Sequence, residues 1–345
     1  MEPSWSRRLF VAALACATTV RGRRTGRCSV CGRTLPSEYW VYNEKACCSQ
    51  ACADQLKPLC SECGEPVSGE YISVENKSYC SSACFESTLP ACDLCRNPIK
   101  DGYTVTRHKY CKTCFETHPT CFSCGLPAAH ASRLEDGREI CAPCMRWAVK
   151  KPDLAQPHFD RALRQFQAWT SLKLDTVPTL VLVNRAAMQE LSEDLRKSDS
   201  PVSIRGLYSR QITTTRQLRF GITQKTETDV QERIYIVDHL HDAVFRTAVT
   251  HELMHDLLQE YFPRLETAPL WVHEGICQQA AAEYCQRRNY TDILYGIEHC
   301  TDPDYGDGYR YIKKMMGMGG WPALRRWMEA VDVAALPEEA PRSAP

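Results

Sequence analysis

Paired cysteines that repeat along the N-terminal part of the chain place the strongest constraint on its fold. C-x-x-C pairs open at Cys28, Cys60, Cys92 and Cys121, at intervals of 32, 32 and 29 residues. A second cysteine pair follows each of them after 15 or 16 intervening residues. Of the 21 cysteines in the chain, 17 lie between Cys28 and Cys144, so this spacing indicates four copies of one small module.

Short cysteine pairs that recur in this way favour structural zinc sites over a disulfide scaffold, which is the alternative. A tetrahedral zinc site takes two ligands from each of two turn-sized loops. A repeat this short cannot bury enough apolar surface by itself, so metal binding would supply the free energy of folding. The four predicted ligand sets are Cys28, Cys31, Cys48 and Cys52; Cys60, Cys63, Cys80 and Cys84; Cys92, Cys95, Cys111 and Cys114; and Cys121, Cys124, Cys141 and Cys144.

Each repeat follows the order of a treble-clef or zinc-ribbon unit. The first pair predicts a tight knuckle, two short strands follow, and the second pair opens a helical turn. The array over residues 28–147 resembles LIM domains, and residues 118–124 are similar to a LIM junction. The spacing between consecutive sites differs from that of LIM domains, so His108 or His118 stays open as a replacement ligand in the third site.

The charge balance argues against a nucleic-acid partner. Residues 28–147 contain 12 Lys and Arg against 14 Asp and Glu, and the whole chain has a formal net charge of zero. Four zinc-tetrathiolate centres would each add about two negative charges, whereas phosphate binding needs a basic surface. We therefore predict a protein-binding or scaffolding array. No stretch approaches the roughly 18 apolar residues of a membrane-spanning helix.

Beyond Trp147 the cysteines become sparse, and a second domain is predicted over residues 148–335. Its pattern predicts helices over 158–174, 185–196 and 243–261, with strands over 177–183, 219–223 and 233–237. The fold class is therefore α+β: four small treble-clef or LIM-like zinc modules followed by a domain of mixed helices and strands. Residues 336–345 are predicted to be a disordered tail.

The helix over 243–261 contains the sequence His-Glu-Leu-Met-His at residues 251–255. His251 and His255 are four residues apart, so both imidazoles project from one helix face and can hold one zinc ion. Glu252 beside them can act as the general base towards a zinc-bound water. A surface helix that happens to carry two histidines is the alternative.

A third ligand is predicted in a second helical stretch. Glu274 follows His255 after 18 intervening residues, a separation typical of zinc peptidases that complete the site with a glutamate. His273 is the rival ligand. Because adjacent helical residues point about 100° apart, only one of the two can face the metal, and we favour Glu274.

Several motifs of the second half occur in the order found in a known family. They are His-Glu-Leu-Met-His at 251–255, Glu-Gly-Ile-Cys-Gln at 274–278 and Asp-Tyr-Gly-Asp-Gly-Tyr-Arg at 304–310, with Asp-Gly-Arg at 136–138 and Gly-Leu at 206–207. Over roughly residues 90–330 the chain resembles the DA-one family of plant growth-regulating peptidases, which join LIM-type zinc modules to a zinc peptidase domain. The resemblance implies a gluzincin-like peptidase that makes limited cuts in proteins, with His251, His255 and Glu274 as ligands and Glu252 as base.

Residues 148–335 are therefore predicted to form a zincin-like metallopeptidase domain. The predicted function is that of a zinc metallopeptidase acting on a protein or peptide substrate, with the array as scaffold or protein-binding platform. We expect one catalytic and about four structural zinc ions. The alternative is a catalytically inactive zinc-binding adaptor, against which the intact Glu252 argues. Tyr305, Tyr309 and Arg310 stay open as the oxyanion-stabilising residue, and a plain glycine turn before a helix is the other interpretation of that motif.

Residues 1–27 have the features of an export leader. Arg7 and Arg8 precede a modest apolar run to Val20, and Ala15-Cys16-Ala17 offers a cleavage site. The paired arginines match a twin-arginine signal, which predicts export of the folded protein. A cytoplasmic location is the alternative, and Cys16 is left open as a lipid-attachment residue.

Overall fold

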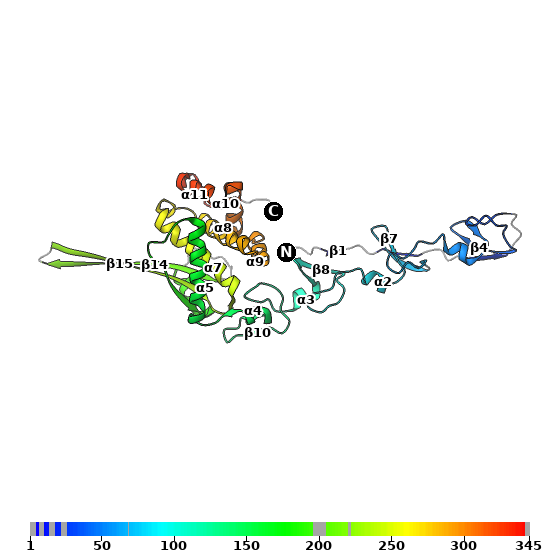
Figure 1. The fold of residues 1–345 in the computed structure, drawn as a ribbon, viewed down its shortest axis with the longest axis horizontal. Coiled ribbons are helices and arrows are strands. Elements are labelled where there is room, and N and C mark those ends of the chain that lie inside the picture. Colours follow the sequence, from blue (N-terminus) through cyan, green and yellow to red (C-terminus); the bar gives the residue numbers. More distant parts are fainter. Residues whose placement is uncertain are drawn as a thin grey trace. The chain divides into compact units, whose positions relative to one another are not determined.

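The computed structural model describes residues 5–6, 10–13, 18–21, 26–67, 69–195, 205–219 and 222–341. The chain divides into two compact units, Met1–His118 and Pro119–Pro345 (Figure 1). The first unit holds three cysteine modules, and the second holds the fourth module with all that follows. The boundary between the units thus falls before the fourth module, whereas the end of the cysteine repeat predicts a domain boundary after that module.

Each module of the first unit is a β-hairpin followed by a short helix. The hairpins are β4 (Glu38–Tyr42) with β5 (Lys45–Cys47), β6 (Glu70–Val74) with β7 (Lys77–Tyr79), and β8 (Asp101–Val105) with β9 (His108–Cys111). The helices are α1 (Gln50–Asp54), α2 (Ser82–Glu86) and α3 (Lys112–Thr117). Ser49 and Ser81 cap α1 and α2 by accepting hydrogen bonds from the backbone N–H of Cys52 and Cys84. The caps therefore fix the second cysteine pair at the start of each helix.

Short strands near the N-terminus extend these hairpins. β1 (Trp5–Ser6), β2 (Phe10–Ala13) and β3 (Thr18–Arg21) pair antiparallel with β8, β6 and β4, which makes three three-stranded sheets. Arg7, Arg8 and Cys16 lie outside the described residues. The export signal and the lipid attachment therefore stay predictions.

The second unit combines helices with a three-stranded sheet. Its longer helices are α5 (Pro152–Thr170), α6 (Arg185–Leu195), α7 (Asp242–Tyr261), α8 (Leu270–Arg288), α9 (Thr291–Glu298), α10 (Gly308–Met316) and α11 (Gly320–Ala330). In the sheet, β15 (Ile222–Val237) pairs parallel with β13 (Thr179–Val183) and antiparallel with β14 (Gly206–Arg219). The predicted α+β class is confirmed, with four units of hairpin and short helix that each gather four cysteines.

The β14–β15 hairpin differs from what the sequence predicts. The predicted strand over 219–223 contains the end of β14 and the start of β15, and residues 220–221 lie outside the described part. The paired strands of the hairpin extend well beyond the helices of the second unit (Figure 1). Polar and β-branched residues predominate in the outer parts of both strands, which suits a ribbon that packs on the core only near its base.

The core of the second unit forms around α7. Apolar side chains from α5, α7, α8 and β15 share one buried cluster, which includes Phe159, Phe166, Leu253, Leu257, Trp271, Ile276 and Ile234. α7 is buried on nearly all sides, as expected for a helix in the centre of a domain. This burial holds the residues of the His-Glu-Leu-Met-His motif in fixed positions.

The fourth module packs as part of this unit. It consists of β10 (Ser132–Arg133), β11 (Glu139–Ile140) and α4 (Ala142–Arg146), and β12 (Ala148–Val149) then pairs with β16 (Leu240–His241). Arg138 is 3% exposed, forms an ion pair with Asp136 at 2.7 Å, and donates from Nη1 to the backbone oxygen of Asp238 at 2.7 Å. Asp238 also pairs with Arg138 through its carboxylate. The guanidinium thus joins the module to the start of the α7 region.

Residues near the C-terminus contact the core of the second unit. Trp271 donates from its indole nitrogen to the backbone oxygen of Pro337 at 2.9 Å, and Ala340 is buried against the core. Within the predicted disordered tail, Leu336 and Ala340 thus contact the core, and residues 342–345 lie outside the described part. Among the helices that the structure describes, none is long and apolar enough to span a membrane.

Removal of the Arg138 side chain tests the attachment of the fourth module. Arg138→Ala would leave the carboxylates of Asp136 and Asp238 without their common partner, so we expect a loss of about 3 kcal/mol in the free energy of unfolding. Denaturant unfolding of the full chain measures this change. Arg133→Ala, at an exposed position of β10, is the control and should change stability by less than about 0.5 kcal/mol. Equal midpoints for the two variants would contradict the assigned role of Arg138.

Candidate functional site

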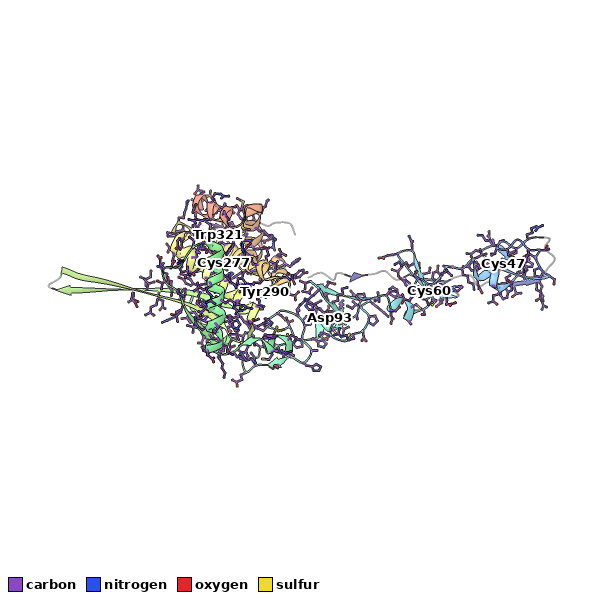
Figure 2. The ribbon with its side chains drawn as sticks, viewed as in Figure 1. Cys47, Cys60, Asp93, Cys277, Tyr290 and Trp321 are labelled. Carbon is purple, nitrogen blue, oxygen red and sulfur yellow. The ribbon has the colours of Figure 1, made fainter. Side chains whose placement is uncertain are left out.

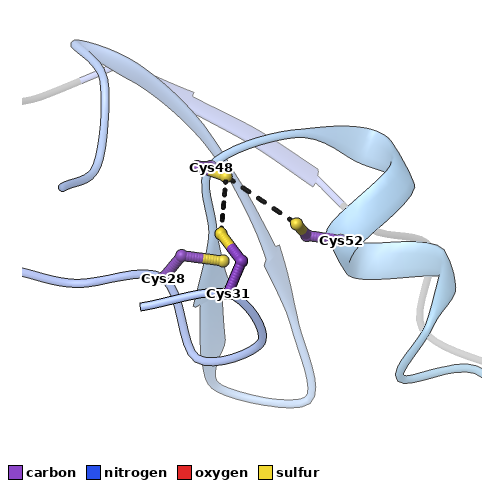
Figure 3. Close-up of side chains that lie close together, drawn as sticks. All are labelled: Cys28, Cys31, Cys48 and Cys52. Atoms are coloured by element: carbon purple, nitrogen blue, oxygen red, sulfur yellow. Dashed lines mark hydrogen bonds between the residues drawn. The ribbon is translucent and has the colours of Figure 1, made fainter. Parts of the chain in front are cut away.

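The structure brings the predicted cysteine sets together in all four modules. Within each set the four sulfur atoms lie within 4.8 Å of one another. Figure 3 shows the first set, in which the sulfur of Cys48 lies 3.4 Å from that of Cys31 and 3.7 Å from that of Cys52. A disulfide requires about 2.05 Å, and the cysteines of all four sets are free thiols. Four converging thiols form the donor set of a structural zinc site.

Backbone amides favour the thiolate form that a metal requires. In the second module, the N–H of Cys80 donates to the sulfur of Cys60 at 3.5 Å. Burial acts to raise the pKa of Cys60, but the surrounding backbone N–H groups lower it to about 6.

The turn between Cys60 and Gly64 closes with a hydrogen bond from the N–H of Gly64 to the carbonyl oxygen of Cys60 at 3.0 Å, with Gly64 at a φ of 78°. Glycine adopts this left-handed conformation at little cost.

The third module also gathers four thiols. Cys92, Cys95, Cys111 and Cys114 converge there. His118 instead places Nδ1 3.0 Å from the carbonyl oxygen of Cys114, and His108 places Nδ1 3.6 Å from Asp93. The geometry thus favours the set of four cysteines over a histidine replacement.

A second kind of centre lies where α7 meets α8. His251 and His255 of α7 direct Nε2 towards the carboxylate of Glu274 on α8, at 3.1 and 3.7 Å. The centroids of the two imidazole rings are 5.1 Å apart. His251, Glu252 and Glu274 are each less than 10% exposed. Two imidazoles and one carboxylate that converge in a buried position have the chemistry of a zinc site.

The charges within this centre are mutually stabilising. Burial acts to raise the pKa of Glu274, but the imidazoles of His255 and His251 lower it below its ordinary value. Burial acts to lower the pKa of His255, but contacts with Cys277 and Glu274 raise the pKa above its ordinary value. The carboxylate is thus held in the ionised form, which is the form that binds a cation.

Glu252 lies beside the centre and against the edge strand β14. Burial raises the pKa of Glu252, and the backbone N–H of Tyr208 donates to its carboxylate. A Cβ atom at Gly206 would lie 2.5 Å from Oε1 of Glu252, so only glycine leaves room for the carboxylate in this position. The start of β14 therefore determines where the carboxylate of Glu252 lies.

Two further buried carboxyl groups hold the strands to α7. The hydroxyl of Tyr208 lies 3.0 Å from Oδ1 of Asp256 and 3.2 Å from Oε1 of Glu232. Burial and the charge of Glu232 raise the pKa of Asp256 to about 8. A protonated Asp256 suits this arrangement, because a phenol carries only one hydrogen to share between two acceptors.

Of the three residues left open as oxyanion stabilisers, Tyr305 lies at the centre. It belongs to the short helix η2 (Pro303–Asp307), its ring stacks on that of His251 at 6.0 Å, and its side chain hydrogen-bonds Glu274. Tyr309 packs in a separate apolar cluster beside α9. Arg310 bonds Asp307 at 2.6 Å and the carbonyl oxygen of Cys300 at 2.9 Å.

Glycines allow η2 and α10 to approach α8 closely. A Cβ atom at Gly275 would lie 2.6 Å from the carbonyl carbon and oxygen of Gly308, and one at Gly308 would lie 2.4 Å from the carbonyl oxygen of Trp271. The two backbones therefore touch where Gly275 follows Glu274. This contact places Tyr305 beside His251 and Glu274, two of the predicted metal ligands.

His273, the rival third ligand, has other partners. Its ring hydrogen-bonds the backbone of Leu265 and Ala268, and burial lowers its pKa. The structure thus brings Glu274 to the two imidazoles and leaves His273 beside η1 (Pro263–Leu265). The assignment of His251, His255 and Glu274 as ligands stays a prediction that this geometry supports.

Three residues at the centre had no predicted role: Gly206 and Cys277 occur only within quoted motifs, and Tyr208 follows the first of these motifs. Gly206 and Tyr208 come from a strand whose contact with α7 no local pattern indicates. Cys277 does have a signal, since it follows Glu274 by three residues and so shares its helix face. Its sulfur lies with the ring nitrogens of His251 and His255 in a group that could hold a metal.

Comparisons with known proteins confirm the resemblance at a distance. The chain is 27% identical over 192 aligned positions to Protein DA1-related 1 of Arabidopsis thaliana, covering 50% of this chain and 34% of that protein. It is 28% identical over 178 positions to LIM domain-containing protein HDR3 of Oryza sativa subsp. japonica, covering 46% and 35%. The matched region spans about a third of the length of these relatives. No family model and no solved structure matches the chain.

An alanine at Gly275 tests the backbone contact that positions Tyr305. Gly275→Ala would force α8 away from Gly308, so we expect a loss of about 1–3 kcal/mol in the free energy of unfolding, measured by denaturant titration. Gly296→Ala is the matched control, because Gly296 lies in α9 with no atom within 4 Å of an added Cβ. That control should be neutral or slightly stabilising. A stable Gly275→Ala protein would show that the contact is not required.

Proposed function

We propose that this chain is a zinc-dependent peptidase whose centre is formed by His251, His255, Glu274 and Glu252. The observation that carries the proposal is the convergence of two imidazoles from α7 and one carboxylate from α8, with a second carboxylate buried beside them. The distant similarity to DA1-related proteins supports the same reaction class.

The residues present fit a catalytic zinc ion. His251, His255 and Glu274 would hold it through two Nε2 atoms and a carboxylate oxygen, which is a common three-ligand set of zinc peptidases. When bound there, zinc polarises both a water molecule and the carbonyl group of the scissile peptide. The imidazoles of His255 and His251 lower the pKa of Glu274, so its carboxylate carries the negative charge that a cation requires.

Glu252 would act as the general base and then as the acid. Its carboxylate accepts a proton from the attacking water and passes it to the leaving amine. A raised pKa suits this role, because a carboxylate whose pKa lies nearer to neutrality is a stronger base. The N–H of Tyr208 and the space left by Gly206 hold the carboxylate in place.

Tyr305 would stabilise negative charge on the carbonyl oxygen of the substrate. Its phenol is buried beside His251 and Glu274, and burial raises the pKa of Tyr305 above its ordinary value. The hydroxyl therefore keeps its hydrogen and can donate it to an oxyanion.

The cysteine modules would serve as a scaffold or as a platform for a protein partner. They contain an excess of acidic side chains, and one relative carries the name LIM domain-containing protein. Protein or peptide is accordingly the proposed substrate class.

Replacement of the base separates catalysis from metal binding. Glu252→Gln keeps the size of the side chain but removes proton acceptance, so cleavage should fall on the order of a hundredfold or more. Zinc content should stay that of the wild type. Proteomic identification of new N-termini, produced by the wild type but not by the variant, measures the loss and reports the substrates.

Glu260→Gln is the control for that experiment. Glu260 lies on the same helix and accepts hydrogen bonds from the backbone of Asp175 and Thr176, away from the centre. Its replacement should leave cleavage in place. Undiminished proteolysis by Glu252→Gln would contradict the proposed mechanism and favour an adaptor role.

Removal of one hydroxyl tests the oxyanion donor. Tyr305→Phe should lower kcat by roughly 100-fold or more, the effect typical of one lost oxyanion donor, with zinc content unchanged. Steady-state kinetics on a cleaved peptide gives kcat and KM separately. Tyr309→Phe removes a hydroxyl from the same motif outside the centre and should retain activity. Equal kcat values for both variants would exclude Tyr305 from this role.

A further inference from the structure

Cys277 is a buried thiol on the face of α8 that carries Glu274. It is fully buried, with 0% exposure, and Figure 2 labels it among the helices of the second unit. Residues three apart on a helix are neighbours on its surface, so Glu274 and Cys277 both face α7. α8 thus directs two side chains that can bind a metal towards the same pair of imidazoles.

The sulfur of Cys277 lies close to the imidazoles of both histidines. It forms a group with ring nitrogens of His251 and His255 in which all the atoms are within 4.8 Å of one another, and its side chain hydrogen-bonds His255. Ligand atoms on one tetrahedral zinc ion lie about 3.3–3.8 Å apart, given bond lengths of about 2.0–2.3 Å. A small contraction of the group would therefore bring the sulfur into coordination.

Burial of a thiol in α8 does not by itself produce this geometry. Cys285, two turns further along the helix, is also fully buried, but its sulfur lies 3.5 Å from the hydroxyl of Thr247 and outside the centre. Cys277 therefore differs from Cys285 in its position on the helix face that meets the imidazoles. This pair supplies a matched comparison within one helix.

We propose that Cys277 is an additional protein ligand of the catalytic metal ion, so that the site holds the peptidase in a latent state. The proposal rests on the peptidase function above. With His251, His255, Glu274 and Cys277 all bound, the ion has four protein ligands and no position for water, which is the arrangement of a structural site. Catalysis then requires the thiolate to leave and a water molecule to take its place.

The thiolate competes well for that position. Soft sulfur ligands bind zinc more strongly than oxygen ligands do, so the closed arrangement is favoured until a substrate or partner displaces Cys277. Only a ligand exchange is needed, since the thiolate leaves with its electron pair and water enters with its own. The activity of the wild type should reflect the small fraction of molecules in the open state.

Cobalt substitution tests the coordination without any need for turnover. In the full chain, the catalytic ion is exchanged for Co²⁺ while the modules keep zinc, which metal analysis verifies as about four zinc and one cobalt per chain. A thiolate ligand gives Co²⁺ a charge-transfer absorption band in the near ultraviolet. We expect this band in the wild type and in Cys285→Ser, and we expect its loss in Cys277→Ser and Cys277→Ala.

Cleavage measured on the same proteins gives the second readout. If the closed state holds about nine-tenths of the molecules, Cys277→Ser and Cys277→Ala should raise basal cleavage roughly tenfold, while Cys285→Ser should not. A wild type with one bound cobalt and no thiolate band would overturn the proposal, even if a Cys277 variant failed to fold. The absorption band tests whether Cys277 binds the metal, and the Glu252→Gln experiment tests whether the chain is a peptidase. A failure of one proposal can therefore be told apart from a failure of the other.

Discussion

The contact between α7 and α8 brings together four ionisable side chains, those of His251, Glu252, His255 and Glu274. The interactions around them offset the free-energy cost of removing these groups from water. An isolated charge in a protein interior is costly unless it is paired. His251 and His255 face Glu274 at 3.1 and 3.7 Å, which offsets the loss of hydration on both sides. Fully buried apolar residues next to them, such as Leu253 and Ile276, supply the favourable burial that holds the helices together.

The sequence could predict those parts of the site that lie within one helix. The four-residue spacing of His251 and His255 places both side chains on one face of α7. Helix geometry likewise places Glu274 and His273 on different faces of α8. The cysteine ligand sets of the modules could also be predicted from the sequence, because each pair lies within one turn and the pairs recur at a regular interval. In these cases local geometry alone determines which side chains can converge.

The remainder depends on contacts between distant segments, which no spacing indicates. Tyr305, Tyr309 and Arg310 were equivalent in the sequence, because their choice depends on the backbone contact between Gly275 and Gly308. The strand that contacts Glu252 and the two glycines between α8 and α10 likewise depend on the close fit of segments that are distant in the sequence. Such complementarity is visible only after the chain has packed.

The packing of the fourth module against the rest of the second unit likewise could not be predicted from the cysteine repeat, and a buried arginine contributes to it. Arg205 immediately precedes β14 and donates to the carbonyl oxygen of Phe122 at 3.2 Å. Burial lowers the pKa of Arg205, whereas the thiols of Cys124 and its fellow ligands raise it. A zinc tetrathiolate carries about two negative charges and so stabilises this guanidinium.

The next residue after Arg205 is Gly206, whose backbone lies against the carboxylate of Glu252. The guanidinium therefore fixes the start of β14 from one side, while the hydroxyl of Tyr208 fixes it from the other through Asp256. Loss of metal from the fourth module would remove part of the charge that holds Arg205 in place. In the proposed peptidase, the position of the strand beside Glu252 would thus be coupled, through Arg205, to the metal site of the fourth module.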